Sequence, residues 1–439
     1  MYLQGSTQEE CHSNFLVTKE LLNSLGIYFN EQKSVLTPAR NLIHLGFHLN
    51  SSKMTVTLGD DKISKIKETC ISVLTSRKLT IRCVAQLIGK FVSCFPGMEY
   101  GPLHFRHLEW NKSCSLKENK GNYEGNITLT TESICEINWW IKNVGKASRS
   151  ITHGNAVRTL RTDASLQGWG ANLLSGLSTG GRWSDTEKRD HINILELRAA
   201  FLGLQALCKS LSNVHIQLQM DNVTAVCYVN NMGGSHSVKC NELAFCIWEW
   251  CISKHIWLSA THIPGVSNVE ADRESRLLDD KTEWRLNPDV FLHCVELWGK
   301  PDIDLFALRL NYQLKPYVSW RADPEALAID AFKMNWSNLF LYIFPPFSLI
   351  SRILQKLQDD QATAIMIVPK WPTQTWYPKL LSLMTSEPLN LPKTKDLLTL
   401  PGQQSKIHPL YPHLHMIACH LSAKASARRV LVKEHKTLS

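Results

Sequence analysis

The spacing of apolar and polar positions divides the chain into three regions. Between residues 7 and 144, apolar residues recur at intervals of three and four, which is the spacing of amphipathic helices. Between residues 157 and 280, short apolar runs typical of strands alternate with helical stretches in the order β-β-β-α-β-α-α-β-α. Strand-like runs and helical stretches continue from Trp284 to about residue 400. The pattern predicts an α/β protein of several domains.

Length and composition fit this prediction. A chain of 439 residues has room for roughly two to four domains, and 44% hydrophobic with 20% charged residues is a globular balance. The net charge of +9 is compatible with a polyanionic partner without requiring one. The thirteen cysteines form no Cys-x-x-Cys motif, which disfavours a zinc ribbon and favours free thiols in a reducing compartment.

Membrane insertion is not expected from the sequence. The N-terminal residues are polar, and the longest apolar stretch, at residues 339–347, is short and contains two prolines. We therefore expect a soluble intracellular protein without membrane contact, and nothing in the composition favours the nucleus over the cytoplasm.

Four carboxylates stand at positions that can converge in the predicted α/β region. Asp163 and Asp221 each end a predicted strand, Glu196 lies early in the long helix, and Asp272 lies in the last helix. Magnesium prefers oxygen ligands, and cleavage of a phosphodiester commonly uses two such ions. The four residues together predict a magnesium site suited to that reaction.

Taken singly, each of these residues has an ordinary explanation. An aspartate that ends a strand, such as Asp163, is usually a turn or cap residue. Glu196 alone would be interpreted as a solvated helix residue, and Asp272 with Arg276 as a surface pair four residues apart. The specific signal is the complete set, in this order and on these elements.

The residues around these carboxylates resemble a known family. The matching segments are TDASLQGWGA, NILELRA, QMDN and HIPGVSNVEAD, which contain Asp163, Glu196, Asp221 and Asp272 respectively. They resemble the type 1 ribonuclease H domain of retroelement polymerases, and the last segment is similar to the retrotransposon version in particular. The resemblance implies a ribonuclease H-like mixed five-stranded sheet with helices over residues 155–280.

The same resemblance implies a chemistry. It assigns the four carboxylates as catalytic residues and ligands of two Mg²⁺ ions, with Mn²⁺ as an alternative, in an endonuclease that cleaves the RNA strand of RNA–DNA hybrids. The residues that we expect to bind nucleic acid are Asn193, Asn222, His262 and Asn268. The histidine that many relatives carry after the last strand is missing from Gly265–Ser267, and His262 does not match its position. We therefore interpret His262 as a strand-end or hybrid-contacting residue.

The N-terminal flank resembles the end of a reverse transcriptase of the DIRS type. We interpret residues 1–58 as a palm remnant, with LGFHL (45–49) as a primer-grip strand, and residues 59–150 as thumb and connection helices with a linker. The resemblance implies that the chain starts just after the polymerase's catalytic aspartates, so polymerase activity is not expected. Association with a complete polymerase is left open.

The C-terminal flank resembles a degenerate methyltransferase-like α/β domain at residues 284–400. Phe344–Phe347 (FPPF) is similar to the Asp-Pro-Pro-Tyr tetrapeptide of adenine methyltransferases, but Phe344 cannot accept a hydrogen bond from a target amine. This argues against methyl transfer. Trp371, Trp376 and Tyr377 are interpreted as core residues, with base stacking as the alternative. Residues 401–439 are expected to form a loosely ordered tail.

The sequence therefore supports one leading hypothesis and one alternative. The first is a metal-dependent RNA–DNA hybrid endonuclease within a truncated retrotransposon polymerase, with weak activity expected because the missing palm and fingers normally help to hold the duplex. The alternative is a non-catalytic remnant that binds nucleic acid. Survival of all four carboxylates favours the first hypothesis, and cleavage of a labelled hybrid decides between the two. The site assignment requires that the four carboxylates cluster, and it is wrong if any one lies far from the others.

Overall fold

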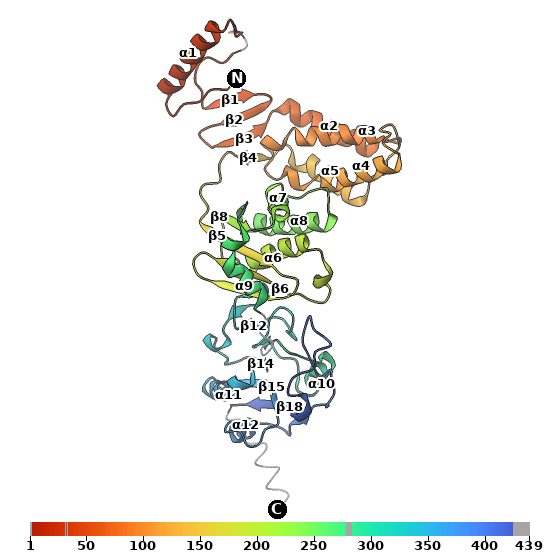
Figure 1. The fold of residues 1–439 in the computed structure, drawn as a ribbon, viewed down its shortest axis with the longest axis vertical. Helices are drawn as coiled ribbons and strands as arrows, with labels where there is room; N and C mark the ends of the chain where they lie inside the picture. The colour runs from red at the N-terminus through yellow and green to blue at the C-terminus, as the bar shows by residue number, and fades with distance from the viewer. Residues whose placement is uncertain (1, 31, 33, 278–282, 425–439) are drawn as a thin grey trace, which may run out of the picture. The chain divides into compact units, whose positions relative to one another are not determined.

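The computed structural model describes residues 2–30, 32, 34–277 and 283–424. The chain forms two compact units, one made of Met1–Asn155 with Asn231–Asn241 and the other of Ala156–Asn230 with Glu242–Ser439. Figure 1 shows the elements of both units. Among the described residues, every helix is too short or too polar to cross a lipid bilayer.

The first unit combines a small antiparallel sheet with helices. Its strands pair in the order β1-β2-β3-β4. Thr7 caps the first helix by accepting a hydrogen bond from the backbone of Glu10, and no described side chain of that helix is buried. The elements are α1 (Gln8–Ser24), β1 (Asn41–His44), β2 (Phe47–Asn50), β3 (Thr55–Leu58), α2 (Asp60–Thr75), α3 (Ile81–Val92), α4 (Arg106–Glu118), α5 (Thr131–Asn143) and β4 (Ser148–Ser150).

The predicted primer-grip strand at residues 45–49 is partly wrong. Leu45 and Gly46 have φ angles of 51° and 78° and form the turn of the β1–β2 hairpin. Positive φ angles of this kind belong to tight hairpin turns, where glycine is favoured. Only Phe47–Leu49 of the predicted segment is extended, within β2.

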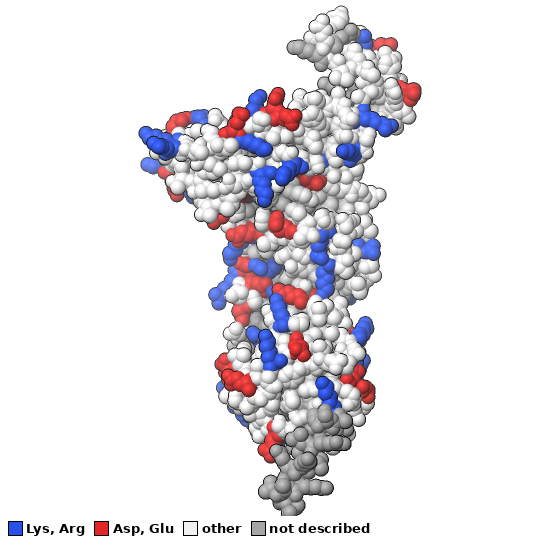
Figure 2. Space-filling view, turned by 180° about the vertical axis from the view of Figure 1, so that it is seen from behind, with Lys and Arg blue, Asp and Glu red and all other residues white. Residues whose placement is uncertain are grey.

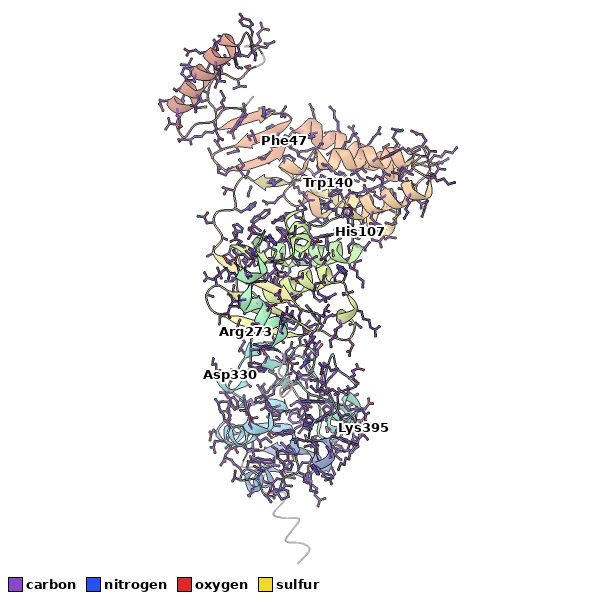
Figure 3. All side chains as sticks on the ribbon, in the orientation of Figure 1. Phe47, His107, Trp140, Arg273, Asp330 and Lys395 are labelled. Carbon is purple, nitrogen blue, oxygen red and sulfur yellow. The ribbon has the colours of Figure 1, made fainter. Side chains whose placement is uncertain are left out.

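The core of the first unit lies among helices α2 to α5. The rings of Phe91 and Trp140 stack in parallel at 4.2 Å between centroids, and Trp140 has no exposed surface. Figure 3 labels Trp140 among these helices. Glu136, also on α5, is buried and accepts hydrogen bonds from the backbone N–H groups of His107 and Leu108 at 3.0 and 2.8 Å. It thereby satisfies amides at the start of α4 that have no partner inside the helix.

The second unit begins with the predicted mixed five-stranded sheet, ordered β7-β6-β5-β8-β9. β5, β6 and β7 are antiparallel neighbours, whereas β8 and β9 run parallel to β5. The elements are β5 (Arg158–Ala164), β6 (Gly168–Leu173), β7 (Ser178–Arg182), α6 (Ile192–Leu207), β8 (His215–Met220), α7 (Val223–Asn230), α8 (Val238–Ser253, of which Glu242–Ser253 belongs to this unit), β9 (Trp257–His262) and α9 (Val269–Arg276). The fold class and the order of elements agree with the sequence prediction.

The long helix α6 packs closely on this sheet. A Cβ atom added to Gly203 would lie 2.8 Å from the Cβ of Ala171 on β6 and 3.2 Å from Thr162 on β5. Strand β8 buries Ile216, Leu218 and Met220 and leaves the alternate side chains half-exposed, as the two-residue period of a strand requires. Glycine therefore lets the helix that carries Glu196 approach the strand that carries Asp163.

A second sheet follows in the same unit, ordered β11-β14-β15-β18-β16. β11, β14 and β15 are parallel, and β18 pairs with both β15 and β16 in antiparallel fashion. The remaining elements are β10 (Arg285–Leu286), α10 (Pro288–Trp298), β11 (Ile303–Asp304), β12 (Val318–Ser319), β13 (Ala328–Ile329), β14 (Phe340–Ile343), α11 (Ile350–Asp359), β15 (Thr363–Pro369), α12 (Tyr377–Leu383), β16 (Leu389–Asn390), β17 (Leu398–Thr399) and β18 (Met416–Ser422).

The prediction of a loosely ordered tail from residue 401 is wrong for β18. This strand pairs with β15 over seven residues, from Thr363↔Ser422 to Pro369↔Met416. Six of its seven side chains are buried, because the strand lies inside the sheet and not at its edge. Of the predicted tail, residues 425–439 lie outside the described part of the chain.

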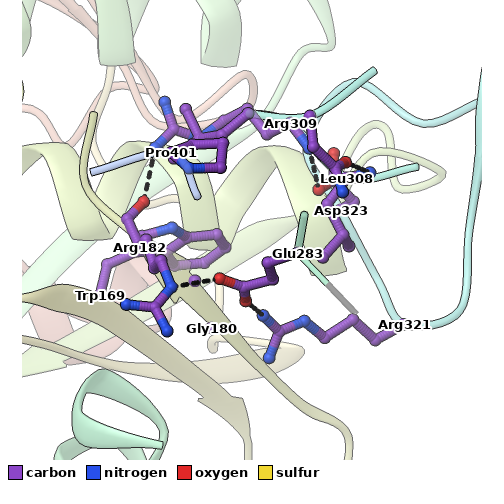
Figure 4. Close-up of a pocket in the computed structure, with 12 residues that line it drawn as sticks. Trp169, Gly180, Arg182, Glu283, Leu308, Arg309, Arg321, Asp323 and Pro401 are labelled. Carbon is purple, nitrogen blue, oxygen red and sulfur yellow. Dashed lines mark hydrogen bonds and ion pairs between the residues drawn. The ribbon is translucent and has the colours of Figure 1, made fainter. Parts of the chain in front are cut away.

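Buried ion pairs link the first sheet of the second unit to the segments that follow α9. Arg182, at the end of β7, pairs with Glu283, and the same carboxylate pairs with Arg321. These side chains line the small cavity shown in Figure 4. Nearby, Arg309 donates hydrogen bonds to both carboxylate oxygens of Glu187, at 2.9 and 3.0 Å. Such bidentate geometry is the strongest form of this contact.

Candidate metal centre

Two of the predicted carboxylates stand at one edge of the first sheet. Asp163 is the sixth residue of β5, and Asp221 directly follows β8. Because β5 and β8 are parallel neighbours, their carboxyl ends meet at the same edge. The side chain of Asp163 is 5% exposed, and Asp221 is half-buried.

Glu196 completes the cluster from α6. Carboxylate oxygens of Asp163, Glu196 and Asp221, one from each residue, all lie within 4.8 Å of one another. Glu196 is 4% exposed, and its Oε2 atom has no hydrogen-bond partner among the described residues. A buried carboxylate oxygen without a partner is costly unless a cation or a proton satisfies it.

The electrostatics of the cluster reflect this crowding of negative charge. Burial, together with the charges of Asp163 and Asp221, raises the pKa of Glu196 to about 9. Burial also raises the pKa of Asp163, and a hydrogen bond from Ser275 opposes that rise. Three hard oxygen donors with an unsatisfied buried oxygen fit a divalent cation such as Mg²⁺ or Mn²⁺, because the ion's charge would offset the mutual repulsion.

Asp272 lies beside this cluster and not within it. Its carboxylate Oδ1 accepts hydrogen bonds from Arg276 Nε and pairs with Arg276 Nη2, at 2.8 and 2.7 Å. The charge of Asp272 nevertheless contributes to raising the pKa of Asp163. The structure thus brings three of the predicted carboxylates together and places the fourth, Asp272, next to them. Asp272 forms the surface pair with Arg276 that was its ordinary explanation in the sequence.

Two glycines allow α9 to sit directly on the sheet. A Cβ atom added to Gly180 of β7 would lie 2.6 Å from the carbonyl oxygen of Glu274, and Gly170 of β6 is in a similar position. Real Cβ atoms do not approach backbone atoms this closely, so only glycine fits. The close approach brings Asp272 and Ser275 to the edge of the sheet where Asp163 lies.

Three of the four predicted nucleic-acid-binding residues border the cluster. Asn222 Nδ2 donates a hydrogen bond to Asn193 Oδ1 at 2.9 Å, and both side chains are half-buried. A ring nitrogen of the exposed His262, Nε2, lies 3.1 Å from the carbonyl oxygen of Asp221. His262 thus contacts Asp221 directly, Asn222 follows it in the sequence, and Asn193 contacts Asn222. A contact with a bound duplex stays a prediction for each of the three.

Asn268 does not fit the predicted role. It has no exposed surface, and its side-chain Nδ2 donates a hydrogen bond to the carbonyl oxygen of Thr162 at 2.9 Å. A side chain buried in this way cannot reach a duplex. The expectation of a nucleic-acid contact by Asn268 is therefore wrong, and the residue instead joins the segment before α9 to β5.

Ser275 is a residue of the site that sequence reasoning missed. It is fully buried, and its Oγ lies 2.7 Å from Asp163 Oδ2. A usable signal was present, because residues three apart in a helix share a face and Ser275 lies three after Asp272.

The second sheet offers no comparable set of carboxylates among its described residues. Phe344 and Phe347 of the FPPF segment pack against its hydrophobic core, and Phe347 meets Trp371 edge to face at 5.4 Å. Trp376 and Tyr377 are 7% and 8% exposed. The core interpretation of these two aromatics is therefore confirmed.

Comparisons with known proteins give similarities at the level of solved structures. No protein-family model matches the chain, and no curated protein sequence does. The chain is similar to RNase H1 from the halophilic archaeon Halobacterium salinarum NRC-1, at 17% identity over 26% of this chain and 92% of that one, with a TM-score of 0.23. LC11-RNase H1 in complex with an RNA/DNA hybrid matches at 18% identity over 26% and 91%, with a TM-score of 0.24.

A longer similarity involves a viral polymerase. The foamy viral protease-reverse transcriptase dRH in complex with double-stranded DNA matches at 13% identity, over 59% of this chain and 44% of that chain, with a TM-score of 0.30. This chain therefore corresponds to less than half of the viral one.

Proposed function

We propose that residues 155–280 form a divalent-metal-dependent endonuclease that cleaves the RNA strand of RNA–DNA hybrids. The observation that carries this proposal is the convergence of Asp163, Glu196 and Asp221 within 4.8 Å. Asp272 and the surrounding retrotransposon-like segments support it. The interpretations of residues 1–58 and 59–150 as a polymerase remnant, and of residues 284–400 as a degenerate methyltransferase-like domain, stay predictions.

Each residue has a separate part in the proposed mechanism. Asp163, Glu196 and Asp221 would hold the first ion, and Asp272 together with Asp163 would hold a second. When bound, the ions would activate a water molecule and stabilise the leaving oxygen of the phosphodiester. Asn193, Asn222 and His262 would orient the nucleic-acid backbone, which is supported by the Asn222–Asn193 hydrogen bond and by the contact of His262 with the carbonyl of Asp221.

The distribution of surface charge bears on how strongly the protein should bind nucleic acid. On the face shown in Figure 2, basic and acidic side chains are interspersed within each part of the chain. Phosphate contacts usually dominate non-specific affinity for nucleic acid, and interspersed charges offer few of them, so affinity for a hybrid should be moderate. This fits the expectation of weak activity.

The test uses the full chain and a hybrid labelled on its RNA strand. With Mg²⁺, the wild-type protein should cleave the RNA strand, whereas Asp221→Asn should lose at least about a hundredfold in rate, because it removes a metal ligand. Glu270→Gln is the matched control, since this carboxylate lies on α9 and pairs with Arg273 outside the cluster. Absence of cleavage by the wild type, with hybrid binding retained, would overturn the enzyme in favour of the non-catalytic alternative.

A further inference from the structure

We infer that Ser275 is a positioning residue of the metal centre, which fixes the carboxylate of Asp163 for metal binding. This inference rests on the proposed function and names a residue that acts on the ions through another side chain. Its basis is the buried contact between Ser275 on α9 and Asp163 on β5, two residues 112 positions apart in the sequence.

The hydroxyl of Ser275 has two acceptors and one proton. Its Oγ lies 2.7 Å from Asp163 Oδ2 and 2.8 Å from the carbonyl oxygen of Asp272. A serine hydroxyl donates only one hydrogen bond at a time. An ionised aspartate is the stronger acceptor, because a charge-assisted hydrogen bond is about twice as strong as a neutral one. The proton therefore goes to Asp163 when that carboxylate carries its charge.

This hydrogen bond fixes the orientation of the Asp163 carboxylate. A carboxylate rotates about its Cβ–Cγ bond, and a donor held on one oxygen sets the direction of the other. Ser275 has no exposed surface, so water does not compete for the contact. Partners of this kind, which orient a metal-binding side chain without touching the ion, commonly contribute 10- to 100-fold to metal affinity.

The backbone of Ser275 is itself fixed by contacts with β6 and with the segment after β5. Ser165, just after β5, donates a hydrogen bond from its Oγ to the carbonyl oxygen of Ser275 at 2.8 Å. The backbone of Ser275 also lies against Gly170 of β6, which leaves the helix no room to shift toward the sheet. The serine is therefore fixed relative to the strand whose aspartate it orients.

The test measures metal binding directly, so it does not depend on catalysis. Mn²⁺ is titrated calorimetrically into the full-length wild type, Ser275→Ala, Ser275→Cys and Ser178→Ala. Ser178 is the matched control, because its Oγ lies 3.3 Å from a carboxylate oxygen of Glu274 on the same helix but outside the cluster. We expect Ser275→Ala to bind about tenfold more weakly, Ser275→Cys to be intermediate because a thiol is a weak donor, and Ser178→Ala to match the wild type.

The outcomes separate the inference from the proposed function. Wild-type affinity in Ser275→Ala overturns the role of Ser275 while leaving the metal centre intact. Absence of saturable Mn²⁺ binding in the wild type overturns the proposed function and this inference with it. If thermal melting shows that Ser275→Ala does not fold, Ser275→Cys decides, since wild-type affinity in that variant also contradicts the inference.

Discussion

Gly170 lies against the backbone of Ser275, so that a Cβ atom added to Gly170 would be 2.5 Å from the Ser275 amide nitrogen. Gly170→Ala should therefore push α9 away from the sheet. We expect a loss of about 2 kcal/mol in the free energy of unfolding, typical of overpacking, together with weaker Mn²⁺ binding. Urea denaturation and calorimetry measure the two effects.

The control for this prediction is a glycine with open space around it. Gly89 is exposed inside α3, and a Cβ atom added there meets nothing within 4 Å. Gly89→Ala should stabilise its helix by about 1 kcal/mol. Equal effects of the two substitutions would contradict the packing account of Gly170.

Under the proposed function, Arg276 would compete with a metal ion for Asp272. Its side chain is 66% exposed, and it pairs with the Asp272 carboxylate at 2.7 Å. Arg276→Gln should tighten Mn²⁺ binding by about two- to fivefold, since an exposed ion pair of this type is worth only a fraction of a kcal/mol. Arg273→Gln is the control, because Arg273 pairs with Glu270 and Glu274 instead. Weaker binding in Arg276→Gln would show that the arginine supports the site.

Glu283 is central to the buried ion pairs of the second unit. Its carboxylate pairs with Arg182 and Arg321, whose side chains are 3% and 11% exposed. Glu283→Ala should lower the free energy of unfolding by about 3–5 kcal/mol, because two buried guanidinium groups lose this counter-charge. Urea denaturation should give nearly the same loss at low and at high salt, because salt screens buried charges only weakly.

An exposed pair provides the comparison for Glu283. Glu325 pairs with Lys315 at 2.6 Å, with both side chains about half exposed. Glu325→Ala should cost less than about 1 kcal/mol. If both substitutions cost the same, burial does not govern the strength of these contacts.

Glu136 should make the first unit less stable as the pH rises. Burial raises the pKa of Glu136 to about 7 from the ordinary 4.5. Between these pH values the unfolded chain has lost the proton that the folded protein keeps. The contribution of Glu136 to the free energy of unfolding is therefore complete below pH 4.5 and disappears as the pH passes 7. The change amounts to about 3 kcal/mol. Protection factors of the α4 amides, measured by hydrogen exchange, should fall across this range.

Two variants on α5 isolate the contribution of Glu136. Glu136→Gln cannot titrate, so the fall in protection between pH 4.5 and 7 should disappear. Glu132→Gln alters an exposed carboxylate on the same helix and should leave the fall unchanged. A fall that persists in Glu136→Gln would assign it to another group.

Local sequence patterns predicted much of the first five-stranded sheet of the second unit. β5, β8 and α6 lie where alternating and helical periods placed them, and their carboxylates follow from strand ends and helix starts. Asn268 could not be placed in this way, because its burial depends on a contact with Thr162 more than 100 residues away. For Ser275 the local spacing offered only a shared helix face with Asp272, whereas its contact with Asp163 joins two different elements. Contacts between elements, unlike the elements themselves, leave little trace in a local pattern.

The position of β18 late in the chain should delay completion of the second sheet during synthesis. β15 can pair with β14 as soon as residue 369 has left the ribosome, but its other edge stays open until Met416–Ser422 has emerged. β16 also has no neighbour in the sheet before then. An open, apolar strand edge promotes association between nascent chains. A chain that ended before Met416 should therefore be prone to aggregation, even though every predicted metal ligand would already be present.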